Sequence, residues 1–74
     1  MINPAQCRAA RALLDWSQQD LAKAAHLGLS TIRDFEKGRR VPTHNNLRGI
    51  KLALEEGGVE IGEERSSVGL KTGC

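Results

Sequence analysis

The chain has 74 residues and a mass of 8.1 kDa, which is enough for one compact domain and too little for two. Catalytic clefts usually lie between large elements or domains, so this size argues against an enzyme. The formal net charge of +2 combines two unlike parts: residues 1–51 hold nine Lys or Arg and four acids, and residues 52–74 hold two and five. The basic part is where a polyanion would bind.

No apolar run approaches the ~20 residues that span a bilayer, and the N-terminus lacks the basic start and apolar middle of a signal peptide. We therefore expect a cytoplasmic protein without membrane contact. Cys7 and Cys74 fit no CxxC or zinc spacing, alone or together with His26 and His44. Two reduced thiols are expected, with Cys7 packed as a small apolar residue, and no metal or other cofactor.

The first two predicted helices each begin with a capping box. Asn3 with Gln6 starts the first, which covers residues 4–14, and Ser17 with Asp20 starts the second. A proline at the first helical position supports the first start. The expected inward faces are Cys7, Ala10 and Leu14 in the first helix and Leu21, Ala22 and Ala25 in the second.

Two further helices follow. Residues 26–28 break the periodicity, and Gly28 is an acceptable cap for a third helix over residues 29–37, which Gly38 ends. A basic loop comes next, and Thr43 caps a fourth helix that a pair of glycines closes. The expected inward faces are Ile32 and Phe35 in the third helix and Leu47, Ile50 and Leu54 in the fourth.

The remaining segment changes character. Residues 59–61 and 68–71 alternate apolar and polar side chains around a turn-rich stretch, which predicts a β-hairpin. A frayed acidic tail is the alternative, because the segment is rich in glycine and lies at a terminus. A lone hairpin is marginal in water, so its strands would have to rest on the helices or on a second chain.

Two short helices with a tight turn between them and a basic loop after them form the helix-turn-helix pattern. The segment SQQDLAKAAHLGLSTIRDFEKGRRVP resembles the Cro and phage-repressor type, or XRE family, of helix-turn-helix proteins. The resemblance covers residues 6–54. It implies a mainly α fold, with a compact four-helix, repressor-like domain over residues 1–58. The alternating pattern described above adds residues 59–74 as a short C-terminal β-hairpin or an extended tail. The positions that carry the resemblance are Ser17, Gln18, Leu21, Ala22, Ala25, Ser30, Thr31, Ile32, Glu36, Gly38 and Pro42.

Three positions depart from the family pattern. His26 stands at the turn position where the family usually has glycine, although a histidine reaches a left-handed conformation at modest cost. Gly28 stands at a cap that is usually Ser or Thr. Asp34 stands on the outer face of the third helix, where the family often contacts bases.

In this family the second helix of the pattern lies in the major groove of double-stranded DNA. The resemblance therefore implies base contacts by Leu29, Ser30, Arg33 and Asp34. Arg33 can bind guanine through two hydrogen bonds, and Leu29 can pack on a thymine methyl group. Asp34 can accept a hydrogen bond from cytosine or pair with a neighbouring arginine, and an ordinary solvated helix face remains the alternative for all four.

Contacts with DNA phosphates are implied for Gln18, Lys37, Arg39, Arg40 and Arg48. For Arg48, simple solvation is an equal alternative. Glu36 is instead expected to be structural, because its equivalent in the family pairs with an arginine of the first helix, here Arg11. A partly buried pair would determine the fold, whereas an exposed pair would contribute little.

Two functions of different classes follow. The first is a sequence-specific DNA-binding transcriptional regulator that acts as a homodimer on a two-fold operator, with an excisionase-like architectural role as a variant. The second is an antiactivator-like or antitoxin-like module that inhibits an activator or toxin by direct contact. The charges of residues 29–37, which cancel, and the acidic C-terminal part favour the second. The residues expected to form the dimer interface are Val59, Ile61, Val68 and Leu70.

Overall fold

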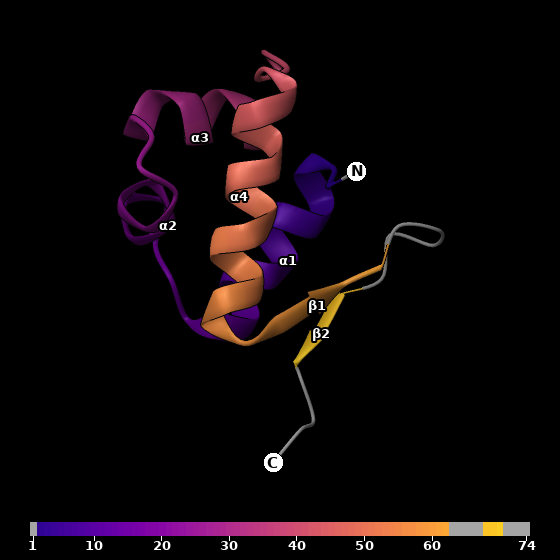
Figure 1. Cartoon of the computed structure of the whole chain (residues 1–74). Helices are drawn as coiled ribbons and strands as arrows, with labels where there is room; N and C mark the ends of the chain where they lie inside the picture. The colour runs from indigo at the N-terminus through magenta and orange to yellow at the C-terminus, as the bar shows by residue number, and fades with distance from the viewer. Residues whose placement is uncertain (1, 63–67, 71–74) are drawn as a thin grey trace.

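The computed structural model describes residues 2–62 and 68–70, which form four helices followed by an antiparallel pair of strands (Figure 1). The expected fold class, mainly α with a four-helix domain and a short C-terminal hairpin, is confirmed. The elements are α1 (Pro4–Leu14), α2 (Gln18–Ala25), α3 (Leu29–Glu36), α4 (His44–Gly57), β1 (Val59–Ile61) and β2 (Val68–Leu70).

Side-chain caps fix the starts of three of the four helices. At α1 the Asn3 side chain accepts from the Gln6 backbone N–H at 2.8 Å, and the Gln6 side chain accepts from the Asn3 N–H at 2.9 Å. Ser17 and Asp20 form the same reciprocal pair at α2, with both bonds at 3.0 Å. The Thr43 hydroxyl caps α4, whereas the N-cap residue of α3 is Gly28, which has no side chain to form a cap.

The tight turn between α2 and α3 depends on a left-handed residue. His26 ends α2 with φ 58° and ψ 43°, and its backbone N–H donates to the Lys23 carbonyl. The Leu27 N–H then donates to the Ala22 carbonyl at 2.9 Å, which closes the end of α2. The chain thus turns within three residues, and a histidine fills the position where glycine is favoured.

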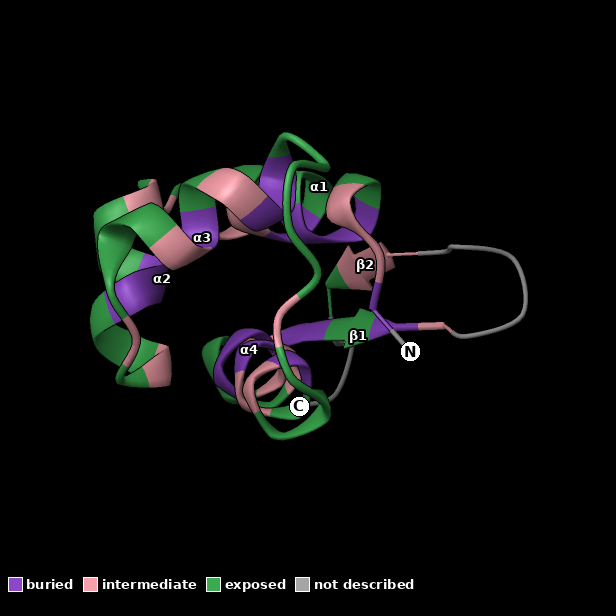
Figure 2. Ribbon diagram, turned by 90° about the horizontal axis from the view of Figure 1, so that it is seen from above, coloured by how far each residue is buried: buried purple, intermediate pink, exposed green. Residues whose placement is uncertain are grey.

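The core lies between the helices and continues beneath the hairpin (Figure 2). Most residues predicted to face inward are buried, and the exceptions, Leu14 and Ala25, are half-buried and pack against the core. Glu36 and Gln6 are the buried polar residues of the described chain. Each helix and β1 contribute to this core, through Cys7, Ala10, Leu21, Ala22, Ile32, Phe35, Leu47, Ile50, Leu54, Val59 and Ile61.

The hairpin packs against the helices as part of the same body. β1 contacts α1 and α4, and β2 contacts α1. Val59 pairs with Leu70 and Ile61 with Val68, while the Gln6 side-chain amide donates to the Gly62 carbonyl. The predicted hairpin is therefore present, and a frayed tail is excluded for the residues that the structure describes in this segment. Residues 63–67 and 71–74, Cys74 included, lie outside the described residues.

None of the helices in the described part of the chain is long and apolar enough to cross a membrane. Within residues 2–62 and 68–70, no three His, Cys, Asp or Glu side chains gather as the ligands of a metal ion would. Cys7 is a free, buried thiol.

Candidate nucleic-acid interface

α3 presents two different sides. Ile32 and Phe35 face the core, and Leu29, Ser30 and Arg33 are exposed on the opposite side, where Leu29 retains 37% of its accessible surface. Asp34 is half-buried beside them. The structure therefore brings the four predicted base-contacting residues to the outer side of one short helix.

The predicted phosphate-contacting cations lie at the end of α3, in the loop that follows it and on α4. Lys37 caps the end of α3, Arg39 and Arg40 lie in the following loop, and Arg48 is exposed on α4. The same loop exposes Val41, which retains 80% of its surface. None of these cations, nor Arg33, forms an ion pair with any residue that the structure describes.

Glu36, at the last position of α3, is held by side chains from α1 and α2. Arg11 forms a bidentate pair with the Glu36 carboxylate: Nε donates to Oε2 at 2.6 Å and Nη2 donates to Oε1 at 2.7 Å. The Cys7 thiol donates to Oε2 at 3.1 Å, and the Gln18 amide donates to Oε1 at 3.1 Å. The carboxylate is thus the meeting point of three helices, and we call these four residues the Glu36 cluster.

Two further contacts tie the cluster to the backbone. Arg11 Nη1 donates to the Trp16 carbonyl at 3.0 Å, which fixes the link between α1 and α2. Arg8 donates to the backbone carbonyl of Glu36 at the end of α3. Because the cations and the thiol satisfy both Glu36 oxygens and its carbonyl, the orientation of α3 on α1 and α2 is fixed by hydrogen bonds as well as by packing.

The cluster keeps Glu36 charged. Burial raises the pKa of its carboxyl group, but hydrogen bonds from Arg11, Cys7 and Gln18 favour the carboxylate, and the net result is a lowered pKa. Burial also raises the pKa of the Cys7 thiol, and the hydrogen bond to Glu36 raises it further. Cys7 therefore stays protonated, and it serves as a hydrogen-bond donor besides filling space as a small core residue.

The inward position of Glu36 corrects the charge balance inferred from the sequence. Glu36 is 3% exposed and is neutralised by Arg11, so it adds no negative charge to the outer side of α3. Two cations, Arg33 and Lys37, then face one acid, Asp34. The outer side is net positive rather than neutral, which removes one argument for the protein-binding alternative.

A helix-turn-helix family model matches residues 8–55, which include the Glu36 cluster apart from Cys7, the whole of α2 and α3, and the basic loop. The chain belongs to the XRE-type helix-turn-helix family. A comparison with curated proteins found no match.

In this helix-turn-helix protein, the four residues predicted to form a dimer interface do not share one surface. Val59 and Ile61 are buried in the core of their own chain, because β1 packs on α1 and α4. Val68 is half-buried, and Leu70 retains 52% of its surface. The expectation that all four would lie on a thin ribbon without a partner is therefore wrong for Val59 and Ile61.

The hydrogen bonds from Cys7, Arg8 and Gln18 to Glu36 were not predicted from the sequence. Cys7 was expected to pack as a small apolar residue, and Arg8 was given no role. Both lie on α1 within four residues of Arg11, so the helical spacing of Cys7 and Arg11 could have placed the thiol on the same side as the guanidinium.

Proposed function

We propose that the protein is a cytoplasmic, sequence-specific DNA-binding transcriptional regulator that acts as a homodimer on a two-fold operator. The observation that carries this proposal is the outer side of α3, which is exposed, net positive and without ion-pair partners in the described chain. Membership of the helix-turn-helix family supports DNA as the ligand. In this family the second helix of the motif enters the major groove.

Each residue of the outer side has a role in this proposal. Arg33 binds guanine O6 and N7 through two hydrogen bonds, Ser30 donates to or accepts from a base edge, and Leu29 packs on a thymine methyl group. Asp34 accepts from cytosine N4. These contacts select the sequence, because each base pair presents a distinct pattern of donors and acceptors in the major groove.

The surrounding cations position the helix on the duplex. Lys37, Arg39, Arg40 and Arg48 contact phosphates, and such contacts fix register and orientation without reading sequence. Gln18 is shared between two tasks: one N–H of its amide donates to Glu36, and the second N–H is assigned to a phosphate at the start of α2. The DNA backbone is thereby connected through Gln18 to the residue that holds α3.

Dimerisation is assigned to the exposed edge of the hairpin. A single module of this size binds DNA weakly, and two half-sites one helical turn apart supply the missing affinity. Leu70 is exposed on β2, and β2 pairs on only one side with a strand of the described chain. Exposed strand edges of this kind pair readily with a second chain.

Leu70→Glu in the full chain tests the dimer better than truncation, because removal of residues 59–74 would also remove Val59 and Ile61 from the core. Sedimentation should show a dimer for the parent chain at micromolar concentration and a monomer for the variant, with unchanged helical content. A parent chain that remains monomeric at high micromolar concentration contradicts this assignment.

The DNA ligand itself is tested by selecting duplexes from a random-sequence pool with the full chain. We expect an enriched sequence with two-fold symmetry and half-sites about 10 base pairs apart. Its affinity should fall steeply as salt rises, because bound cations release counterions from the phosphates. The alternative, an antiactivator-like module, predicts no enriched sequence and capture of a protein from nuclease-treated extract of the native cell.

A further inference from the structure

One side of α1 is both exposed and apolar. Arg8 and Arg11, the charged residues of this helix, both donate to Glu36, so their guanidinium groups are engaged with α3. The other exposed residues of α1 lie together on one side of the helix, and we call them the α1 outer face: Ala5, Ala9, Ala12 and Leu13. A surface helix usually turns charged or polar side chains to solvent, so this face is unlike an ordinary solvent side.

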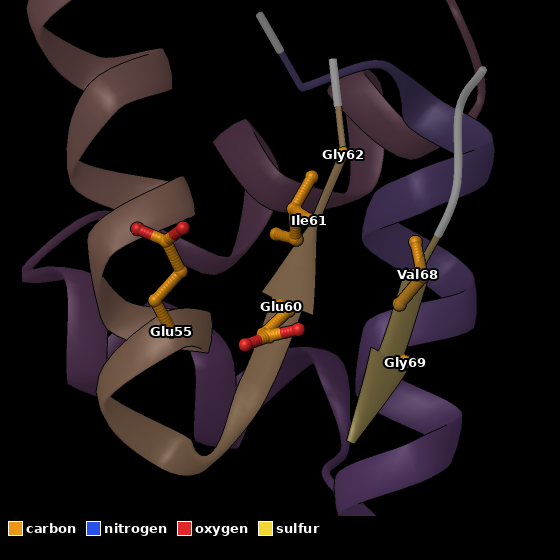
Figure 3. Close-up of a pocket in the computed structure, with 6 residues that line it drawn as sticks. All are labelled: Glu55, Glu60, Ile61, Gly62, Val68 and Gly69. Carbon is orange, nitrogen blue, oxygen red and sulfur yellow. The ribbon is translucent and has the colours of Figure 1, made fainter. Parts of the chain in front are cut away.

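The β-hairpin lies directly beside this face. Near the N-terminus of α1, Gln6 donates to the Gly62 carbonyl after β1. At the other end of β1, a Cβ atom on Gly58 would lie 4.0 Å from Leu14 Cδ2. β1 therefore runs antiparallel to α1 and begins next to its C-terminal half. Figure 3 shows the indigo ribbon of α1 next to β2, and these two elements contact each other.

Two exposed leucines lie where the hairpin and the α1 outer face adjoin. Leu70 pairs with Val59, and paired residues point to the same side of a hairpin, which here is the side packed on the helices. Leu70 nevertheless retains 52% of its surface, so it lies at the margin of that packing. Leu13 comes seven residues after Gln6, hence on the hairpin side of α1, and retains 42%. The apolar surface thus continues from α1 to β2.

The strand edge alone is too small to hold two copies together. β2 has three residues, whereas a standard protein interface engages about 20–30 residues on each side. The proposed homodimer therefore needs further apolar surface. The other large exposed apolar residues of the described chain lie elsewhere: Leu29 on α3, Val41 in the basic loop and Leu52 on α4. The α1 outer face is the apolar surface that adjoins β2.

We propose that the α1 outer face and Leu70 form one surface, and that the same surface of a second copy packs on it about a two-fold axis. This inference rests on the proposed homodimer and names the residues that hold it. In a two-fold interface each patch meets its own copy, and a patch without charges does so without like-charge repulsion. Alanines let the two α1 helices approach closely, and Leu13 and Leu70 of each copy supply the larger contacts.

The test is Ala9→Glu in the full chain, with Ala24→Glu on α2 as the matched control at another exposed alanine. Ala9→Glu would bury two unpaired carboxylates, one from each copy, so the dissociation constant of the dimer should rise at least about a hundredfold. Ala24→Glu should change it less than twofold. Glutamate is a good helix former, so both variants should keep the circular dichroism of the parent. Sedimentation equilibrium measures the dissociation constants.

A second measurement uses the parent chain without substitution. Amide spectra of the isotopically labelled chain, recorded over a dilution series, report which residues change surroundings when the copies separate. We expect the largest changes over residues 8–13 and 68–70. Binding of Ala9→Glu to a duplex with a single half-site should equal that of the parent, because the α1 outer face holds none of the predicted DNA contacts.

Four results would overturn the proposal. If Ala9→Glu remains dimeric while Leu70→Glu is monomeric, the strand edge suffices and the proposed homodimer stands without α1. If dilution changes fall mainly on α3 or α4, the second copy lies elsewhere. If Ala9→Glu weakens binding to a single half-site, the substitution acts at the DNA-binding side. If the parent is monomeric at high micromolar concentration, the homodimer itself fails, and binding to a single half-site then shows whether DNA remains the ligand.

Discussion

The inner and outer sides of α3 both carry charged side chains, but these side chains differ in burial and in their partners. On the inner side, Glu36 is almost fully buried and accepts hydrogen bonds from Arg11, Cys7 and Gln18. On the outer side, Arg33 and Asp34 form no ion pair with any described residue. A buried charge that loses its partner is strongly destabilising, whereas an exposed charge contributes little to stability. Burial, more than residue type, thus separates the residues that hold the helix from those that make no ion pair within the described chain.

The strongest test of this difference is Glu36→Ala. The substitution would leave the Arg11 guanidinium without its carboxylate in a partly buried site, and we expect a loss of about 3–5 kcal/mol in the free energy of unfolding. Asp34→Ala, two residues away on the outer side, is the matched control and should stay within about 0.5 kcal/mol of the parent. Thermal melts of both variants would measure the two losses of stability. Equal shifts of the melting temperature would show that the two sides of α3 contribute equally to stability.

On the outer side, the expected effects are on binding. Arg33→Ala should cost about 1–3 kcal/mol of specific binding and relax the preference at one base pair. Arg40→Ala should weaken binding to all sequences about equally. It should also reduce the slope of the logarithm of the affinity against the logarithm of the salt concentration by about 1. Neither substitution should move the thermal melt. If affinity for every duplex stays the same in both variants, α3 does not lie in the groove.

The inner side should also make stability depend on pH. Burial raises the pKa of Glu36, but its hydrogen bonds lower it more, so the folded chain has a lower pKa than the unfolded value of about 4.3. As pH falls through that value, the unfolded chain takes up the proton first, and the free energy of unfolding decreases. Urea unfolding at pH 7 and pH 3 should show this loss.

Glu36→Gln is the informative variant for the pH series, because it should remove part of the acid dependence. Asp20 also has a lowered pKa, through hydrogen bonds with the backbone and side chain of Ser17 at the start of α2, so it shifts stability in the same direction. Asp20→Asn therefore serves as the comparison. An acid dependence that Glu36→Gln leaves intact would assign it to the caps rather than to the cluster.

The local features of this comparison were predictable from the sequence, and the long-range ones were not. Capping boxes at Asn3 and Ser17 act over three residues, so their spacing is visible in the chain and their helices begin where predicted. The pairing of Arg11 with Glu36, 25 residues apart, was implied only by resemblance to the family. Charge counting along α3 failed because it could not tell that Glu36 points inward.

The long-range contacts of the hairpin were not predictable from the sequence either. Its alternating pattern predicted the strands but left open whether they would rest on the helices or on a second chain. The contact that helps to decide this, between Gln6 and Gly62, joins residues 56 positions apart. Val59 and Ile61 were therefore assigned to a second chain when their own helices cover them. The depth to which an amphipathic strand is buried depends on the neighbours that the fold supplies, and local periodicity does not contain that information.

The smallest expected effect concerns the start of α3, where the two sides meet. Gly28 has φ −74° and ψ 150°, a conformation open to any residue, and a Cβ atom there would lie 3.9 Å from Ser30 Oγ and 4.0 Å from Thr31 Oγ1. Gly28→Ser therefore fits without strain and can supply the missing cap, which should stabilise the chain by a few tenths of a kcal/mol. Gly28→Ala is the control, since it adds the same Cβ without an oxygen. A rise in the thermal melt for Ser but not for Ala would show that only the cap was lacking; equal rises would assign the gain to the loss of glycine flexibility in the unfolded chain.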